Sequence, residues 1–387
     1  MAGPLEGIKV LEMAGIGPGP MCAMLLADLG ATVLRVDRKE PSGLGIERPL
    51  RYNTLLRNRY AIAVDLKSEQ GAQFVASLAA GADILIEGFR PGVMERLGLG
   101  PDACLGRNPR LVYGRITGWG QKGPLAMAAG HDINYLALTG LLDAIGRHGE
   151  APSVPLNVVG DYAGGALYLA VGVLAALLNA RAAGRGQVVD AAIVDGAAHL
   201  SCTFFGMLAA GIWKEGRGGN LLDSGAPFYD CYACSDGHYV SVGPIEPKFY
   251  REMLDILGLA DRQLPDPRDV SGWPAIRKAL AAAFGSRDRE EWMRLFANSD
   301  ACVTGVLRFL EAPDHPHLRA RSTYVDVEGV VQPAPAPRFS ATPTALPFGP
   351  RPVSTENNRR ALEPWLSAEA LEQALTSGVM QSTGEPG

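Results

Sequence analysis

Two short stretches of this 387-residue sequence combine residue types that suit acid–base chemistry. In GHDINY, residues 130–135, His131 stands between a glycine and an aspartate, a polar setting that is unusual for a core histidine. In LNVVGDYAGG, residues 156–165, Asp161 follows an apolar run and opens a helical pattern. An imidazole and a carboxylate can donate and accept protons near neutral pH when their surroundings tune them. His131 and Asp161 are therefore candidates for catalysis.

Asp161 also has a structural interpretation. The apolar run before it predicts a strand that ends at Gly160, so that Asp161 would cap a helix expected to reach about Asn179. The N-terminus of a helix favours an ionised carboxylate, and its free N–H groups can bind an oxyanion. Gly164 and Gly165, in the first turn, would let a bulky ligand approach the backbone. Capping and catalysis are compatible, and both interpretations stay open.

A third acidic residue, Glu246, lies in SVGPIEPKFY, residues 241–250. It follows a predicted strand and precedes a predicted helix, so it suits a helix cap. A carboxylate on such a loop can also orient an imidazole for proton transfer.

The stretch of residues 10–38, VLEMAGIGPGPMCAMLLADLGATVLRVDR, has the order strand, glycine-rich turn, helix and strand. That order is typical of nicotinamide-binding units. The turn, however, is GIGPGP and not G-x-G-x-x-G, and Pro18 and Pro20 lack the N–H groups that a pyrophosphate needs. Arg35 and Arg38 flank Asp37, which suits a phosphate better than a ribose hydroxyl. These residues disfavour a nicotinamide as the ligand.

The elements that must position these side chains begin with an alternation of strands and helices. Apolar strands are expected within residues 9–14, 32–37, 61–66, 82–89 and 110–116, with helical patterns between them. This alternation predicts a doubly wound α/β sheet with right-handed crossovers. Basic residues near the strand ends would collect a ligand with several phosphates. They are Arg38, Arg57, Arg59, Lys67, Arg90 and Arg96.

The length of the chain exceeds what one hydrophobic core usually reaches, so two domains are expected. We predict a large Rossmann-like domain over residues 1–191 and a linker helix over 192–228. A smaller α+β domain is predicted over residues 229–319, beginning with a hairpin at 229–242. Residues 320–387 are expected to return to the large domain, first as an extended proline-rich segment and then through one helix near 366–376.

The composition disfavours several classes of protein. A net charge of −5 argues against nucleic acid as a partner, and the most apolar helical stretch, residues 163–178, falls short of the ~20 residues of a membrane span. Cys231 and Cys234 form a C-x-x-C without a second pair of metal ligands nearby, so we expect buried strand cysteines. The first residues lack a signal-peptide pattern, and a cytoplasmic location is expected.

Together and in this order, GIGPGP, GHDINY, VGDYAGG and GPIEPKFY resemble the α-methylacyl-CoA racemase branch of the family III CoA-transferase superfamily (CaiB/BaiF type). The similarity runs from GIKVLEMAGIGPGP to PAPRFS and covers nearly the whole chain. It implies an isomerase of lipid metabolism that interconverts (R)- and (S)-2-methylacyl-CoA thioesters by proton transfer through an enolate. It also implies an interlocked homodimer with the active site between subunits. No separate cofactor is implied, because coenzyme A is part of the substrate.

The resemblance assigns roles by position. His131 and Asp161 match the two acid/base residues, and Glu246 matches the carboxylate that partners the histidine. An alternative is a CoA transferase, in which Asp161 is the nucleophile and forms a mixed anhydride. Such transferases commonly carry a glycine-rich loop in place of GPIEPKFY and need no histidine at position 131. The positions that match CoA- or substrate-binding residues are Ile16, Arg38, Val64, Lys67, Gly88, Arg90, Arg96, Gly130, Asp132, Asn134, Tyr135, Tyr162, Gly164 and Gly165.

Overall fold

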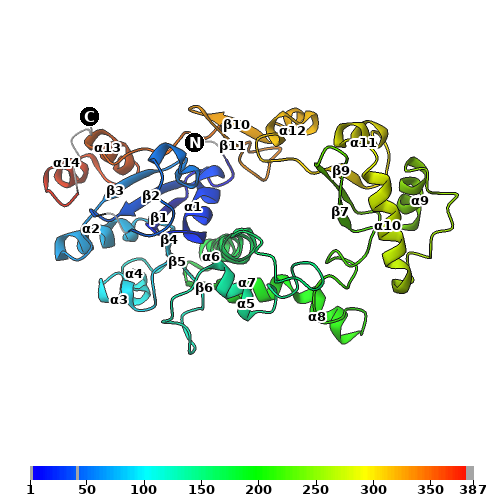
Figure 1. The fold of residues 1–387 in the computed structure, drawn as a ribbon. Coiled ribbons are helices and arrows are strands. Elements are labelled where there is room, and N and C mark those ends of the chain that lie inside the picture. Colours follow the sequence, from blue (N-terminus) through cyan, green and yellow to red (C-terminus); the bar gives the residue numbers. More distant parts are fainter. Residues whose placement is uncertain (1–2, 41–42, 381–387) are drawn as a thin grey trace. The chain divides into compact units, whose positions relative to one another are not determined.

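Six short apolar segments form one parallel sheet in the computed structural model, which describes residues 3–40 and 43–380 (Figure 1). The strand order is β3-β2-β1-β4-β5-β6. Strands buried on both faces read as nearly continuous apolar runs, which is why the sequence revealed the first five. The sixth, residues 188–192, is buried only at its last two residues. The predicted α/β fold with a parallel sheet is confirmed. The strands are β1 Lys9–Met13, β2 Thr32–Asp37, β3 Tyr60–Ala63, β4 Ile84–Glu87, β5 Val112–Thr117 and β6 Val188–Ala192.

Helices cover both faces of this sheet (Figure 1). Successive strand residues point to opposite faces, so Leu11 and Leu34 join one core while Val10 and Val33 join the other. The first core is completed by α2 Glu69–Ala80, α3 Val93–Arg96, α4 Pro101–Arg107, α13 Thr355–Leu362 and α14 Ala368–Thr376. The second is completed by α1 Pro18–Asp28 and α6 Tyr168–Ala183.

A π-helical segment, η3 Val158–Leu167, leads directly into α6. Together they span Val158–Ala183, 26 residues, so the expectation of a helix too short to cross a membrane is wrong about its length. Length and composition alone would allow a membrane span, but half of the most apolar window is buried. Leu169, Val173 and Leu177 pack in the second core. These contacts are those of a core helix.

The chain forms two units. One unit contains Met1–Thr139, Leu156–Leu200 and Pro316–Gly387, and the other contains Gly140–Pro155 and Ser201–His315. The sequence placed these boundaries at 191, 228 and 319 and did not assign 140–155 to the smaller domain. An ion pair links this segment to the rest of the unit, since Arg147 Nη2 lies 2.7 Å from Asp230 Oδ1. Arg277 donates to the same carboxylate.

The second unit has its own core beneath a three-stranded antiparallel sheet. The predicted hairpin is confirmed as β7 Asp230–Ala233 and β8 Tyr239–Val242, and the sequence missed β9 Val303–Gly305. Cys234 is buried as expected, but Cys231 points to the exposed side of β7, so the prediction of two buried cysteines is wrong. The helices are α8 Cys202–Ala209, α9 Pro247–Ile256, α10 Trp273–Phe284 and α11 Arg289–Leu295, with short 3-10 turns η4 Val270–Gly272 and η5 Ala312–Asp314.

The return segment is more regular than its prolines suggested. After α12 Pro316–Ala320, β10 Tyr324–Val327 and β11 Val330–Pro333 form an antiparallel hairpin. Glu328 and Gly329 both have positive φ, the conformation of a tight hairpin turn that matches the twist of the strands. The expected extended segment is thus confined to residues after β11, and α13 is an additional helix. Residues 381–387 of the predicted return segment lie outside the described residues.

A buried polar network fastens the return segment to the sheet. Arg57 lies 2.6 Å from Asp28 and also donates to Gln332 Oε1 at 2.9 Å and to the Pro333 carbonyl at 2.7 Å. Asn58 donates to Asp28 at 2.7 Å and accepts the N–H of Phe348 at 2.9 Å. These two residues follow the 3-10 turns η1 Leu50–Tyr52 and η2 Thr54–Leu56.

Candidate active site

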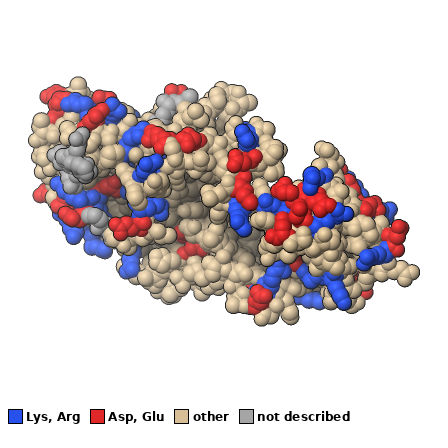
Figure 2. Space-filling model, turned by 45° about the horizontal axis from the view of Figure 1, so that its top comes forward, with Lys and Arg blue, Asp and Glu red and all other residues tan. Residues whose placement is uncertain are grey.

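The carboxyl ends of the parallel strands place four predicted ligand-binding loops along one edge of the sheet. Lys67 lies on the loop after β3, Arg38 on the loop after β2 and Ile16 on the loop after β1. Gly88 and Arg90 lie on the loop after β4, and all five residues are exposed. The strand order reverses between β1 and β4, the place where open α/β sheets bind ligands. On the face shown in Figure 2, basic and acidic side chains are interspersed.

A buried carboxylate, Glu87, stabilises the loop after β4. Glu87 accepts the N–H of Phe89 at 2.8 Å and pairs with Arg115 at 2.7 Å. The guanidinium of Arg38 lies over the Phe89 ring, 5.5 Å from its centroid. Glu87 and Arg115 therefore fix the backbone that presents Gly88 and Arg90. Arg96, at the end of α3, is also exposed.

Three of the candidate binding residues, two basic and one apolar, are buried. Arg57 and Arg59 are each 3% exposed and pair with Asp28 and Glu12, so their interpretation as phosphate-collecting residues is wrong. Val64 is 1% exposed, and its backbone forms a bridge with Met380. Val64 therefore offers no side-chain surface to coenzyme A.

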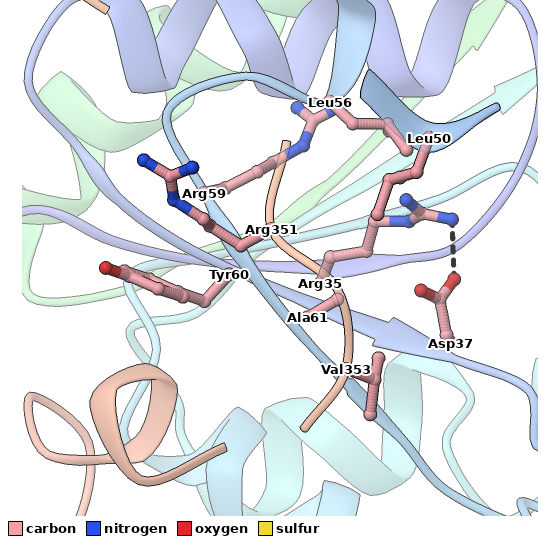
Figure 3. A pocket seen from close by; sticks show the side chains of 9 residues that line it. All are labelled: Arg35, Asp37, Leu50, Leu56, Arg59, Tyr60, Ala61, Arg351 and Val353. Carbon is pink, nitrogen blue, oxygen red and sulfur yellow. Dashed lines mark hydrogen bonds and ion pairs between the residues drawn. The ribbon is translucent and has the colours of Figure 1, made fainter. Parts of the chain in front are cut away.

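Arg59 also lines a cavity of about 80 Å³ beside β2 and β3 (Figure 3). Its basic residues are paired with carboxylates: Arg35 with Asp37 at 2.6 Å, and Arg351 with Glu328 at 2.5 Å. This cavity is a site of internal ion pairs and does not include the acid–base candidates. Its lining residues are Arg35, Asp37, Leu50, Leu56, Arg59, Tyr60, Ala61, Arg351 and Val353.

Asp161 lies inside the helix and does not cap it. The segment LNVVG, expected as a strand, contains Asn157 as the N-cap and the start of the π-helix, so both the strand and the capping role were wrong. The Asp161 carboxylate accepts a hydrogen bond from Asn157 Nδ2 at 3.2 Å, one helical turn earlier. Its own N–H is bound to Asp132 Oδ1 at 2.6 Å. The sequence had suggested that free N–H groups at this point would bind an oxyanion. The Asp161 N–H is already bound to Asp132 and is not free to do so.

The glycine-rich turn after β1 faces this carboxylate. Gly17 has φ of 66°, and a Cβ on it would lie 3.0 Å from Asp161 Oδ2. α1 begins at the next residue, Pro18. The turn that holds a pyrophosphate in dinucleotide-binding proteins thus contacts an acid–base candidate in this fold.

His131 is exposed and stands at the N-cap of α5 Asp132–Leu138. Its N–H is accepted by Asn134 Oδ1 at 3.0 Å. Tyr135 donates to the carbonyl of Gly130 and packs edge-on against Trp119, with ring centroids 4.8 Å apart. Gly130, Asn134 and Tyr135, predicted to bind substrate, therefore also hold the backbone of His131 in place.

The hydrogen bond between the Asp161 N–H and Asp132, the residue directly after His131, brings the segments of the two candidates together. Burial raises the pKa of the Asp161 carboxyl, the Asn157 hydrogen bond lowers it, the charge of Asp132 raises it and the charge of His131 lowers it. Burial likewise raises the pKa of Tyr135, to about 12. A carboxyl whose pKa is raised above its usual value is better suited to donate a proton as well as to accept one.

Gly164 and Gly165 serve helix packing. Both are buried, and a Cβ on Gly164 would lie 2.9 Å from the backbone N of Ala197 in α7 Ile193–Leu200. A Cβ on Gly165 would lie 3.1 Å from the side chains of Ile193 and Pro18. The close approach expected for a ligand is made by the protein itself. Tyr162, on the same helix, is half-buried.

Glu246 belongs to the second unit, where it is the N-cap residue of α9. Its side chain is exposed and makes no capping hydrogen bond. The structural interpretation of Glu246 as a side-chain cap is therefore wrong, and its pairing with His131 stays a prediction. In the described part of the chain, no group of three or more His, Cys, Asp or Glu residues could hold a metal.

Sequence reasoning missed two residues that touch Asp161. Asn157 lies four positions before it, a helical spacing that a correct helix start would have revealed. Gly17 lies far away in sequence and has no local signal that points to Asp161.

Comparison with known proteins places this arrangement in a family. The model of CoA-transferase family III matches residues 5–358. The chain belongs to this family. Among family III relatives, α-methylacyl-CoA racemase from Mus musculus is 45% identical over 98% of each chain, and the same enzyme from Homo sapiens is 42% identical over 98% of each chain.

Solved structures of the family share the architecture. A CaiB/BaiF family protein from Brucella suis matches with a TM-score of 0.79 and 25% identity, over 91% of this chain and 97% of that chain. Rv3272 from M. tuberculosis matches with a TM-score of 0.75 and 26% identity over the same shares. The parallel sheet and the small antiparallel sheets are thus the family III fold.

Proposed function

We propose that this family III protein is an α-methylacyl-CoA racemase, an isomerase of 2-methylacyl-CoA thioesters. The observation that carries the proposal is the 2.6 Å hydrogen bond between the Asp161 N–H and Asp132, which brings the segment of His131 next to Asp161 on a different helix of the same unit. Full-length relatives at 42–45% identity that bear this name support it.

Inversion of the carbon next to a thioester requires a base on one face and an acid on the other. Neutral His131 removes the α proton from one epimer, and the electron pair moves onto the thioester oxygen as an enolate. Protonated Asp161 then delivers a proton to the opposite face, and the opposite epimer is processed with the roles exchanged. Each positioned acid or base typically contributes ~10²–10⁴-fold to the rate.

The edge of the sheet carries positive charge that can bind the phosphates of coenzyme A. Its diphosphate and 3′-phosphate are multiply charged, and Arg38, Lys67, Arg90 and Arg96 are exposed basic side chains on or beside the loops of that edge. Guanidinium groups bind phosphates through paired hydrogen bonds. We assign these four residues to the CoA moiety, with Ile16 and Gly88 at the point where the strand order reverses.

We also propose that the protein is a homodimer of the cytoplasm, with Glu246 as the partner of His131. An apolar stripe on η3 and α6 supports a protein interface, since Leu167, Val171 and Leu178 are 47%, 69% and 72% exposed. All six cysteines are free, which suits a reducing compartment.

The proposal is tested with one epimer of a 2-methylacyl-CoA in heavy water, in the presence of a free carboxylic acid. We expect deuterium at C2 and loss of optical purity, without transfer of CoA to the added acid. The variants H131A and D161A should each lower the rate by at least ~10². Transfer of CoA to the acid with retention of the C2 proton would instead identify a CoA transferase with Asp161 as its nucleophile.

A further inference from the structure

Asp132 connects the two acid–base candidates. It follows His131 directly as the first residue of α5, and its side chain reaches the helix that carries Asp161. Asp132 Oδ1 accepts the N–H of Asp161 at 2.6 Å, across 29 residues of sequence. Asp132 is thus joined to His131 by a peptide bond and to the backbone of Asp161 by a hydrogen bond.

This contact is built into the surrounding packing. Asp132 is 7% exposed, and a Cβ at position 160 would lie 2.3 Å from its Oδ1. Gly160 is therefore required to admit the carboxylate to the first turn of the π-helix. The first turn of a helix has N–H groups without partners inside the helix, and a buried carboxylate supplies the acceptor.

The carboxylate is not fully satisfied by these contacts. Asp132 Oδ2 is buried and has no hydrogen-bond partner among the described residues. A buried charge with an unsatisfied oxygen is costly, and a shape-filling apolar residue would avoid that cost. The charge at this position therefore calls for a functional reason.

We propose that Asp132 is a positioning residue that sets the placement of Asp161 relative to His131 and places a negative charge beside the Asp161 carboxyl. The proposal rests on the racemase function assigned above. The groups around Asp161 are Asn157 on its own helix, Gly17 in the turn after β1, and His131, Asp132 and the neutral phenol of Tyr135 on α5. Asp132 is the negatively charged member of this set.

The paired variants D132N and D132A separate geometry from charge. Asn keeps an oxygen for the Asp161 N–H, whereas Ala removes both the acceptor and the charge. We expect kcat to fall about 10²-fold in D132A with KM changed less than about threefold, because small displacements of a catalytic group have effects of that size. D132N should retain kcat within about tenfold of the wild type.

The pH profile reports the charge separately. Asp132 raises the pKa of Asp161, so its neutralisation should lower that pKa and move the acid limb of kcat/KM to lower pH in D132N. Amide hydrogen exchange at Asp161 should accelerate in D132A and much less in D132N. A matched control is D102N, the same change at an exposed aspartate in the first turn of α4, which should alter none of these quantities.

The outcomes distinguish the two proposals. If the wild-type protein shows no exchange at C2, the racemase function fails whatever Asp132 does. If the wild type epimerises and D132A keeps wild-type kcat and Asp161 amide exchange, the positioning role is overturned. If D132N and D132A lose kcat equally and the acid limb does not move, neither the positioning role nor the charge effect of Asp132 is supported, and the proposal is overturned.

Discussion

The α carbon of Gly17 lies against the carboxylate of Asp161, so close that a Cβ would stand 3.0 Å from Oδ2. The glycine also has a φ of 66°, in the left-handed region. The glycine-rich turn that first suggested a nucleotide thus limits the space around an acid–base group.

Gly17→Ala should therefore lower turnover through displacement of that carboxylate. The positive φ alone costs about 1–2 kcal/mol of stability for a residue with a Cβ, and the displacement should lower kcat by about 10²-fold. The matched control is Gly258→Ala, where φ is also 66° and nothing lies within 4 Å of the added Cβ. Equal kcat in the two variants would show that the contact with Asp161 is unimportant.

Asn157→Ala should change the pH dependence of catalysis. The Asn157 amide stabilises the ionised form of Asp161, so its loss raises the pKa of that carboxyl. At low pH a protonated Asp161 cannot accept a proton. The acid limb of the kcat/KM profile should therefore move to higher pH, equally for both epimers. Asn357→Ala, which removes an exposed amide on α13, should leave the limb in place.

Glu87→Ala should weaken the binding of acyl-CoA. The variant removes the acceptor for the Phe89 N–H and the partner of Arg115, so the loop that presents Gly88 and Arg90 loses its support. We expect KM to rise about tenfold, equivalent to about 1.4 kcal/mol, with kcat nearly unchanged. Glu95→Gln, at the exposed carboxylate that also contacts Arg115, should change KM much less. A fall in kcat without a change in KM would contradict the assigned role.

Asp28→Ala should destabilise the protein without touching the site. The buried guanidinium of Arg57 would lose its ion-pair partner, a change that typically costs about 3–5 kcal/mol, and Asn58 would lose an acceptor. Chemical denaturation measures the effect. Asp266→Ala breaks the exposed pair with Arg268 and should leave the denaturation midpoint nearly unchanged, because solvent screens exposed ion pairs.

The sequence predicted the sheet well because its strands are buried on both faces and read as apolar runs. The prediction failed at residues 156–160, where a short apolar run suits a strand and a helix equally. The helix is favoured because Gly164 and Gly165 pack closely against α7 and Pro18. The helix α13 was missed because NNRR lacks an apolar pattern, although Ser354 caps it at Asn357 N–H.

Residue types indicated His131 and Asp161 as acid–base candidates, but the sequence did not reveal their surroundings. The contacts of Asp161 with Asp132 and Gly17 join segments distant in sequence, and no local pattern marks them. Arg57 and Arg59 were misassigned for the same reason, since a charge near a strand end looks exposed until its partners are known. One acceptor of Arg57 lies 275 residues away.

The distance between Arg57 and its acceptors also bears on how the protein is made. The large unit is assembled from three separate stretches of chain, and Arg57 and Asn58 bind Gln332, Pro333 and Phe348 in the last of them. During synthesis the sheet would emerge long before these acceptors, and a buried guanidinium would stay only partly satisfied. Contacts so remote in sequence slow folding, so synthesis of the chain must be nearly complete before the large unit can become native.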